Sequence, residues 1–240
     1  MKEERYFYVP DAASTNELPA EEATHALRVL RLQNGDDMYL MDGRGNFYHA
    51  EVSLATHKKC LYTIKENLPQ QKTWRGHIHL AIAPTKNIDR MEWLAEKATE
   101  IGFDELSFLH CSFSERKVLR ADRIEKIVVS AAKQSRKPWM PQVNALESFK
   151  DFITRPREGR KFIAHCYEEI EKKDFFNEIM GDQKNEQITV LVGPEGDFSI
   201  DEVRLAMAQG YESISLGESR LRTETAGLMA VTMAQISLRL

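Results

Sequence analysis

Cysteine is scarce in this sequence and long apolar runs are missing, and each absence excludes a class of protein. The 240 residues contain three cysteines, an odd number without a C-x-x-C pair, so neither a disulfide framework nor a zinc knuckle is expected. No apolar run approaches the roughly 18 residues that a membrane-spanning helix needs, and the first residues lack the apolar core of a signal peptide. We therefore expect a cytoplasmic protein without a membrane partner, with buried, inert thiols at Cys60, Cys111 and Cys166.

Patterns that bind metal ions or phosphates are missing as well. His77 and His79 fall on one side of a probable strand, but no third side chain follows at metal-ligand spacing, so we expect no metal. Neither G-x-x-x-x-G-K-S/T nor G-x-G-x-x-G occurs, which excludes the two common glycine-rich phosphate loops.

Positive charge is concentrated in one segment. The formal net charge is −4, yet residues 111–139 carry eight Lys or Arg against three Asp or Glu, a local net charge of +5. Within it Arg123, Lys126, Lys133 and Lys137 fall on one stripe of a helix expected over 121–135. Arg136 and Trp139 follow, adding groups that suit single-stranded RNA. A solvated helix surface is the alternative interpretation.

The rhythm of apolar residues changes near residue 70. Before it, short strand-like runs surround a tight turn at 42–46 and one helix expected over 20–32, which indicates a small β domain over 1–70. After a polar linker with Pro69 and Gly76, strands alternate with longer helices over 76–240, the pattern of a parallel α/β sheet. We expect those strands at 79–83, 105–110, 161–166, 188–192 and 213–216.

Two of these expected strands end in glycine-bearing loops. Gly193-Pro194-Glu195-Gly196 follows one strand and precedes a helix opened by a Ser199/Glu202 capping box, and a second such loop, 216–227, follows the last strand. Parallel sheets bind ligands at the carboxyl ends of their strands, and glycines let a ligand approach the backbone. Because Glu195 would repel a phosphate, we expect a neutral or cationic small molecule. Two ordinary strand-to-helix turns are the alternative.

These loops carry a family resemblance. G-P-E-G-D-F-S-x-x-E-V, followed by L-G-x-x-x-L-R-T-E-T-A, closely resembles the RsmE-type ribosomal RNA uridine-N3 methyltransferases, a branch of the SPOUT superfamily. The stretches 25–31, 86–100, 114–116 and 134–135 match the same family in order, so the resemblance spans nearly the whole chain. The chain departs from its pattern at three places: Asp197 replaces a glycine, Ser219-Arg220 replaces an R-I pair, and Lys117 stands where the family tends to carry a small residue.

The resemblance implies an α/β fold in which a small PUA-like β-barrel domain that binds RNA precedes a SPOUT parallel-sheet methyltransferase domain with a trefoil knot. It further implies a homodimer that uses S-adenosylmethionine on ribosomal RNA. The apolar helix around 226–234 is a candidate dimer seam, with a buried core helix as the alternative. The implied donor-binding residues are Leu191, Gly193, Glu195, Gly196, Leu216, Gly217, Leu221, Arg222, Thr225 and Ala226. The candidate RNA contacts are Arg28, Arg31, Lys86, Arg90, Arg116, Arg123, Lys133, Arg136 and Lys137.

The implied reaction is methylation of N3 of a uridine in 16S ribosomal RNA within the small subunit. Negative charge develops as the N3 proton leaves, so a nearby cation lowers the barrier. Arg222 is the first candidate for that catalytic role and Arg220 the second, while Glu195 or Glu224 could accept the proton. A SPOUT ribose 2′-O-methyltransferase and a non-catalytic RNA-binding assembly factor are the alternatives.

Overall fold

The computed structural model describes residues 4–180 and 186–239 and divides the chain into two compact units. One unit comprises Met1–Lys72 with Val129–Met140, and the other comprises Thr73–Val128 with Pro141–Leu240. The boundary at residue 72 lies in the linker that the sequence indicates. Residues 129–140, expected in the second domain, instead pack with the first unit, because Ala132 shares a buried cluster with Met41 and Phe47.

The first unit is built on a four-stranded sheet in the order β1-β2-β3-β4. β1 (Tyr6–Tyr8) runs parallel to β2 (Asp37–Met41), and β3 (Asn46–Ala55) and β4 (Cys60–Pro69) continue the sheet antiparallel. The β2–β3 turn forms as expected, since Asp42 Oδ1 accepts the N–H groups of Arg44 at 2.7 Å and Asn46 at 3.0 Å.

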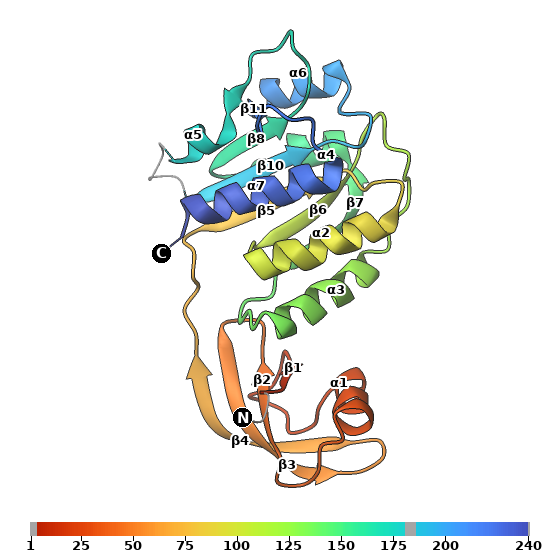
Figure 1. Ribbon diagram of the computed structural model, residues 1–240, viewed down its shortest axis with the longest axis vertical. Coiled ribbons are helices and arrows are strands. Elements are labelled where there is room, and N and C mark those ends of the chain that lie inside the picture. The colour runs from red at the N-terminus through yellow and green to blue at the C-terminus, as the bar shows by residue number, and fades with distance from the viewer. Residues whose placement is uncertain (1–3, 181–185, 240) are drawn as a thin grey trace. The chain divides into compact units, whose positions relative to one another are not determined.

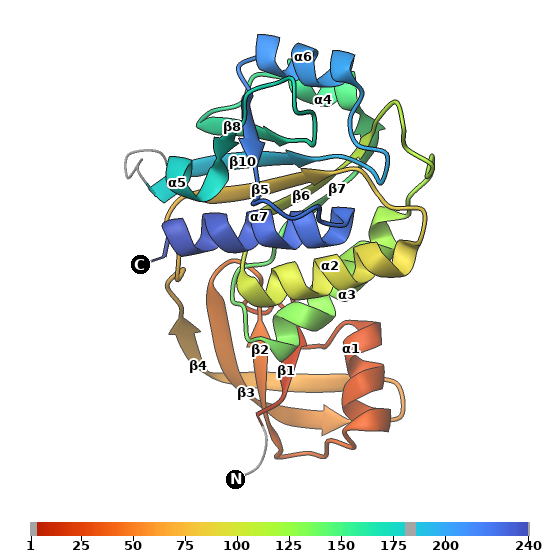
Figure 2. The ribbon, with the colours of Figure 1, turned by 45° about the horizontal axis from the view of Figure 1, so that its top comes forward.

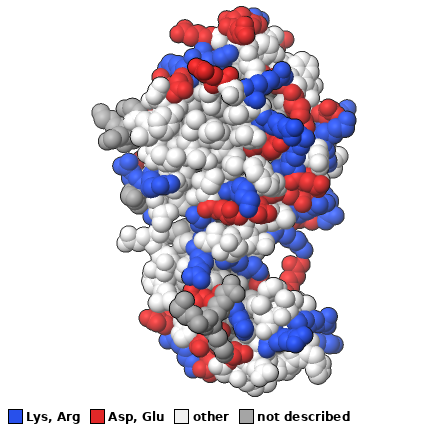
Figure 3. All heavy atoms as spheres, in the orientation of Figure 1, with Lys and Arg blue, Asp and Glu red and all other residues white. Residues whose placement is uncertain are grey.

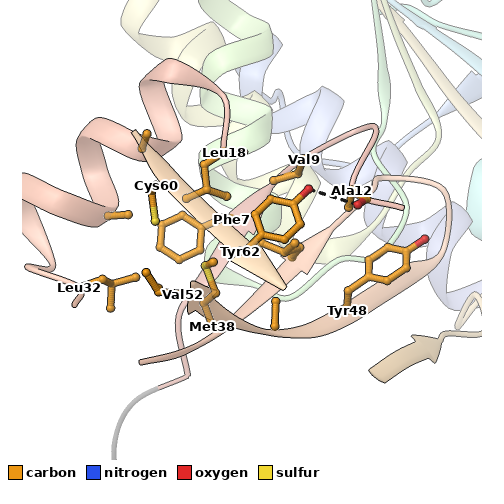
Figure 4. Close-up of a cluster of buried hydrophobic side chains, with 14 residues drawn as sticks. Phe7, Val9, Ala12, Leu18, Leu32, Met38, Tyr48, Val52, Cys60 and Tyr62 are labelled. Carbon is orange, nitrogen blue, oxygen red and sulfur yellow. Dashed lines mark hydrogen bonds between the residues drawn. The ribbon is translucent and has the colours of Figure 1, made fainter. Parts of the chain in front are cut away.

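One side of this sheet encloses an apolar core. Phe7, Met38, Val52 and Tyr62 converge in it, and the Tyr62 hydroxyl donates to Ala12 O at 3.2 Å (Figure 4). These side chains alternate along the strands with less buried ones, which is the period of a half-buried sheet.

The helix expected over 20–32 is shorter than its sequence pattern. α1 (Ala20–Thr24) passes into a π-helical turn at His25–Val29, in which the N–H of Leu30 donates to His25 O at 3.1 Å. Arg31 then has a φ of 54°, in the left-handed region, which ends the helix before the expected stop at Gly35.

The second unit contains a seven-stranded sheet in the order β7-β6-β5-β10-β8-β11-β9, and every pairing in it is parallel. Its strands are β5 (His77–Ile82), β6 (Glu105–His110), β7 (Gln142–Ser148), β8 (Arg160–Ala164), β9 (Lys173–Asp174), β10 (Gln187–Val192) and β11 (Glu212–Ser215). The five expected strands are confirmed within a few residues. β7 and the two-residue β9 were not expected, and β8 ends before His165.

Helices cover both faces of this sheet. α2 (Ile88–Ile101) and α7 (Thr223–Ser237) pack together on one face, where α7 crosses β5 and β10 (Figures 1 and 2). α4 (Phe149–Thr154) and α6 (Ile200–Ala208) cover the other face around Phe152, Phe198 and Val203. α5 (Phe175–Met180) contacts α7, and the chain passes from the second unit to the first within α3 (Ala121–Gln134).

Two sequence signals for helix ends are confirmed in this unit. The predicted capping box opens α6: Ser199 Oγ accepts the N–H of Glu202 at 3.2 Å, and Glu202 Oε2 accepts the N–H of Ser199 at 2.8 Å. α2 ends at Gly102, as its sequence indicates, with a φ of 116° that glycine adopts at little cost.

Candidate active site

A cavity of about 360 Å³ lies at the carboxyl edge of the second unit's sheet. β10, β8 and β11 are neighbours there, so the loops that follow these three strands form its walls. Seven of the ten implied donor-binding residues line the cavity: Gly193, Glu195, Leu216, Gly217, Leu221, Arg222 and Ala226. Leu191 is instead buried within β10, while Gly196 and Thr225 stand beside lining residues.

The loop after β10 is a close-packed turn. The N–H of Asp197 donates to Pro194 O at 2.9 Å, which closes the turn over Glu195 and Gly196. A Cβ on Gly193 would lie 2.9 Å from Phe198 N, so only glycine fits without a backbone shift. The sequence signal of two glycines around a proline therefore reflects a steric requirement at Gly193.

Glu195 joins this turn to the loop after β5. Its Oε1 accepts the N–H of Lys86 at 2.9 Å, although the two residues are 109 positions apart. Arg116 holds the same loop by donating to Thr85 O at 2.9 Å and to Lys86 O. Glu195 does line the cavity, but one of its oxygens is engaged in holding a loop.

Arginines dominate the charge of the cavity wall. Arg220 and Arg222, the sequence candidates for the catalytic cation, both line it with exposed side chains. Arg90 of α2 lines it too, and its Nε lies 3.7 Å from Glu224 Oε1. Glu224 is only 7% exposed, and its Oε2 has no hydrogen-bond partner among the described residues. The sequence placed Arg90 among RNA contacts, whereas the structure places it at the cavity.

The loop after β8 is the wall that sequence reasoning missed. Ala164, His165 and Cys166 line the cavity, although the apolar run 161–166 was interpreted as strand to its end. Cys166 is exposed, so the expectation that all three thiols are buried is wrong for this one. Partial burial, followed by the nearby Asp197 carboxylate, raises the pKa of the Cys166 thiol and keeps it protonated.

Hydrogen bonds fix the tautomer of His165. The Ser213 hydroxyl donates to Glu171 O at 2.8 Å, so it must accept from His165 Nε2, which lies 2.8 Å away. His165 Nδ1 then accepts the N–H of Tyr167 at 3.2 Å. Burial lowers the pKa of His165, which agrees with a neutral ring at physiological pH.

Several candidate RNA contacts turn out to be engaged inside the protein. Lys133 Nζ pairs with Glu22 at 2.6 Å, and the two side chains are only 22% and 10% exposed. Arg123 pairs with Glu92, and Lys86 Nζ pairs with Glu115 at 2.9 Å. The stripe on α3 is therefore not an open row of cations.

The other candidates differ in their surroundings. Arg136 Nη1 contacts Glu4 at 2.8 Å and its guanidinium lies over the Tyr6 ring, 5.2 Å from the centroid. Burial lowers the pKa of Lys137. Arg28 and Arg31 have exposed side chains at the end of the π-helical turn.

The two histidines considered as metal ligands have other roles. Both lie within 4 Å of a Glu105 oxygen, and His79 Nε2 also bonds the Ser107 hydroxyl at 2.8 Å. Across residues 4–180 and 186–239, no group of three or more His, Cys, Asp or Glu could hold a metal ion. Within the same residues, no helix has the length and apolar character needed to cross a bilayer.

Comparison with known proteins agrees with this architecture. Residues 72–235 match the model of the RNA methyltransferase domain, and residues 18–65 match that of the RNA methyltransferase PUA domain. Ribosomal RNA small subunit methyltransferase E of Synechocystis sp. is 30% identical over 215 residues, which are 88% of this chain and 68% of that protein. The Bacillus subtilis protein of the same name is 26% identical over 232 residues, covering 92% and 90%.

Solved structures extend the match to the whole fold. A probable rRNA-methyltransferase from Porphyromonas gingivalis superposes with a TM-score of 0.88 at 40% identity, covering 98% of each chain. Ribosomal RNA small subunit methyltransferase E from Neisseria gonorrhoeae, solved bound to S-adenosyl methionine, gives 0.81 at 27% identity with the same coverage. These findings confirm the sequence resemblance: a PUA-like domain precedes a parallel-sheet α/β domain of the SPOUT type, and the chain belongs to the RNA methyltransferase family of the ribosomal RNA small subunit methyltransferase E proteins.

Proposed function

We propose that this protein transfers a methyl group from S-adenosylmethionine to N3 of a uridine in 16S ribosomal RNA. The observation that carries the proposal is the cavity at the carboxyl edge of the sheet, walled by residues of three loops in a chain of this family. Its substrate would be met in the cytoplasm, as part of the small ribosomal subunit.

The cavity suits a cationic donor of this size. A volume of about 360 Å³ falls within the roughly 300–1,000 Å³ of small-molecule sites. Gly193 and Gly217 present bare backbone, and Gly217 has a φ of 124° with open space where a Cβ would lie. The carboxylates of Glu195 and Asp197 line the wall beside three arginines, so the wall offers charges of both signs and suits a donor that carries both. S-adenosylmethionine supplies a sulfonium-activated methyl group there.

Arginines at the same wall suit the chemistry of the acceptor. When N3 of uridine loses its proton, negative charge spreads over the two flanking carbonyl oxygens, and a guanidinium can donate to such an oxygen. We assign this role first to Arg222, then to Arg220, because both lie in the loop after β11 and are exposed at the cavity. Arg90 is a third cation of the wall, held beside Glu224.

Two residues remain candidates for accepting the N3 proton. Glu195 lines the cavity and has one oxygen outside its bond to Lys86, while Glu224 lies behind Arg90. Alignment of the donor methyl with N3 supplies a further share of the acceleration. The target base must leave its stack to enter a cavity of this kind.

We further propose a homodimer that uses the outer face of α7. Met229 and Ile236 of α7 are 36% and 43% exposed and lie seven residues apart, so they share one face of the helix. Trp93 of the neighbouring α2 is 43% exposed. Figure 3 shows a largely uncharged surface over α7, which is typical of a buried interface.

One experiment tests the main proposal. The protein is incubated with methyl-labelled S-adenosylmethionine and small ribosomal subunits that lack the modification, and the labelled nucleotide is then identified by mass spectrometry. We expect one N3-methyluridine in 16S ribosomal RNA. Label on a ribose hydroxyl would indicate a 2′-O-methyltransferase, and RNA binding without transfer would indicate an assembly factor; either result contradicts the proposal.

A further inference from the structure

The loop after β8 lies between the two loops that the sequence marks for donor binding. β8 is the sheet neighbour of both β10 and β11, so residues 165–167 emerge between the Gly193 turn and the Gly217 loop. This middle loop contains no glycine or proline that would restrict its backbone. Its position must therefore come from contacts with its neighbours.

One carboxylate makes the connection on the β10 side. Asp197 Oδ2 accepts the N–H of Cys166 at 2.8 Å, across 31 positions of sequence. Asp197 Oδ1 accepts the N–H of Phe198 at 2.7 Å, which fixes the carboxylate to its own turn. A single side chain thus binds two loops that both line the cavity.

The backbone of Asp197 has a conformation that is unfavourable for aspartate. Its φ is 68°, in the left-handed region where a residue with a Cβ is disfavoured and glycine is not. Aspartate is tolerated there when its short side chain bonds nearby backbone, as this one does. Glycine would suit the turn better, so the carboxylate contributes something other than turn formation.

The other residues of the middle loop have further contacts. Tyr167 Oη donates to Phe198 O at 2.8 Å, Lys172 Nζ donates to Tyr167 O at 2.5 Å, and His165 connects the loop to Ser213 of β11. None of these bonds involves Cys166, whereas Asp197 bonds it directly and both residues line the cavity. A hydrogen bond to a charged acceptor is about twice as strong as a neutral one, so we expect the Asp197 link to contribute most to the position of Cys166.

We propose that Asp197 is a positioning residue for the donor: it holds the loop 165–167 in place so that the cavity is formed before S-adenosylmethionine binds. The inference rests on the proposed function, because it concerns the same cavity. A preformed wall saves the cost of ordering a loop on binding, so the loss of Asp197 weakens donor binding and leaves methyl transfer from the bound donor unchanged.

Three variants test this role. Asp197→Gly removes the link and suits the backbone, Asp197→Asn keeps one acceptor oxygen, and Asp201→Asn is a matched control on the exposed side of α6. Calorimetry with S-adenosylmethionine should give a dissociation constant raised about tenfold for Asp197→Gly and about threefold for Asp197→Asn. For Asp201→Asn it should equal that of the wild type. At saturating donor, kcat should stay within about twofold of the wild type for all three.

Amide hydrogen exchange supplies a readout that general destabilisation does not imitate. In Asp197→Gly the N–H of Cys166 should exchange at least about tenfold faster, while core amides such as Leu191 keep their protection. An unchanged donor affinity in Asp197→Gly, or a loss of kcat with unchanged affinity, overturns the inference. If Asp197→Gly does not fold, Asp197→Asn decides by the same two measurements. A wild-type protein that binds no S-adenosylmethionine refutes the proposed function itself, which is a different result.

Discussion

Alanine at Gly193 tests whether the turn after β10 has to be free of side chains. The φ of Gly193 lies outside the left-handed region, so alanine is compatible with its backbone and the effect is steric. Its Cβ would lie 2.9 Å from Phe198 N and 3.1 Å from both Asp197 C and Phe198 Cδ2. Phe198 is fully buried, and its N–H is held by Asp197, so neither neighbour can yield cheaply.

The expected magnitude follows from two opposing effects. Overpacking of a tight site costs about 1–3 kcal/mol, while replacing glycine by alanine restricts the unfolded chain and returns about 0.4–1 kcal/mol. We therefore expect Gly193→Ala to lower the free energy of unfolding by about 0.5–2 kcal/mol. The turn must open to make room for the alanine side chain, and this shifts one wall of the cavity. Affinity for S-adenosylmethionine should therefore fall about tenfold or more.

Gly196→Ala is the matched control three residues away. Its Cβ would lie 3.2 Å from Phe113 Cβ, and Phe113 is 52% exposed, so its loop segment has to yield by only a few tenths of an ångström. We expect unchanged or slightly raised stability and nearly unchanged donor affinity. Urea unfolding and calorimetric titration measure both quantities. Equal behaviour of the two variants in both assays would refute the steric argument.

Three further predictions follow from side-chain contacts. Lys133→Met should lower the free energy of unfolding by about 2 kcal/mol, since it leaves the mostly buried Glu22 without its cation. Adding Glu22→Gln to this variant should restore part of the lost free energy, as measured by urea titration. Arg116→Ala should raise the donor KM through the Lys86 loop without changing the salt dependence of RNA binding, whereas Arg28→Ala should reduce that salt slope by about one. The hydrogen bond from Arg160, then that from Lys173, lowers the pKa of Glu212 below its usual 4.5. The ionised carboxylate therefore stabilises the fold above pH 4.5, and this contribution is lost as the pH falls. Glu212→Gln should show a shallower loss of stability below pH 4.5.

Local signals in the sequence were sufficient for much of the site. Gly193 and Gly217 mark their loops because glycine allows close approach or a positive φ, and both requirements act within a few residues of chain. The capping box at Ser199 is equally local. Such features depend on neighbouring residues alone, so a local pattern indicates them, although the sequence interpretation of the glycines was ligand approach and the structure shows close packing at Gly193.

Features that depend on distant pairing were not predictable in the same way. Lys133 has the pattern of a surface cation because its partner Glu22 lies 111 positions earlier. The run 161–166 has the pattern of an uninterrupted strand, although pairing with β11 ends at Ala164 and releases His165 and Cys166 into the cavity wall. The signal that could have indicated this wall is the order of the strands, which no local pattern contains.

Strand order also explains why the site depends on the complete second unit. β10 lies between β5 and β8, so the Gly193 turn is flanked by a loop formed about a hundred residues earlier and by the loop after β8. The bonds from Glu195 to Lys86 and from Asp197 to Cys166 run in these two directions from one turn. Because the turn 194–197 is held from both sides, its conformation depends on the insertion of β10 and not on the turn sequence alone. Donor binding, which requires this turn and the loop before α7, should therefore be lost together with the native sheet, in one cooperative step and not by gradual loosening of a loop.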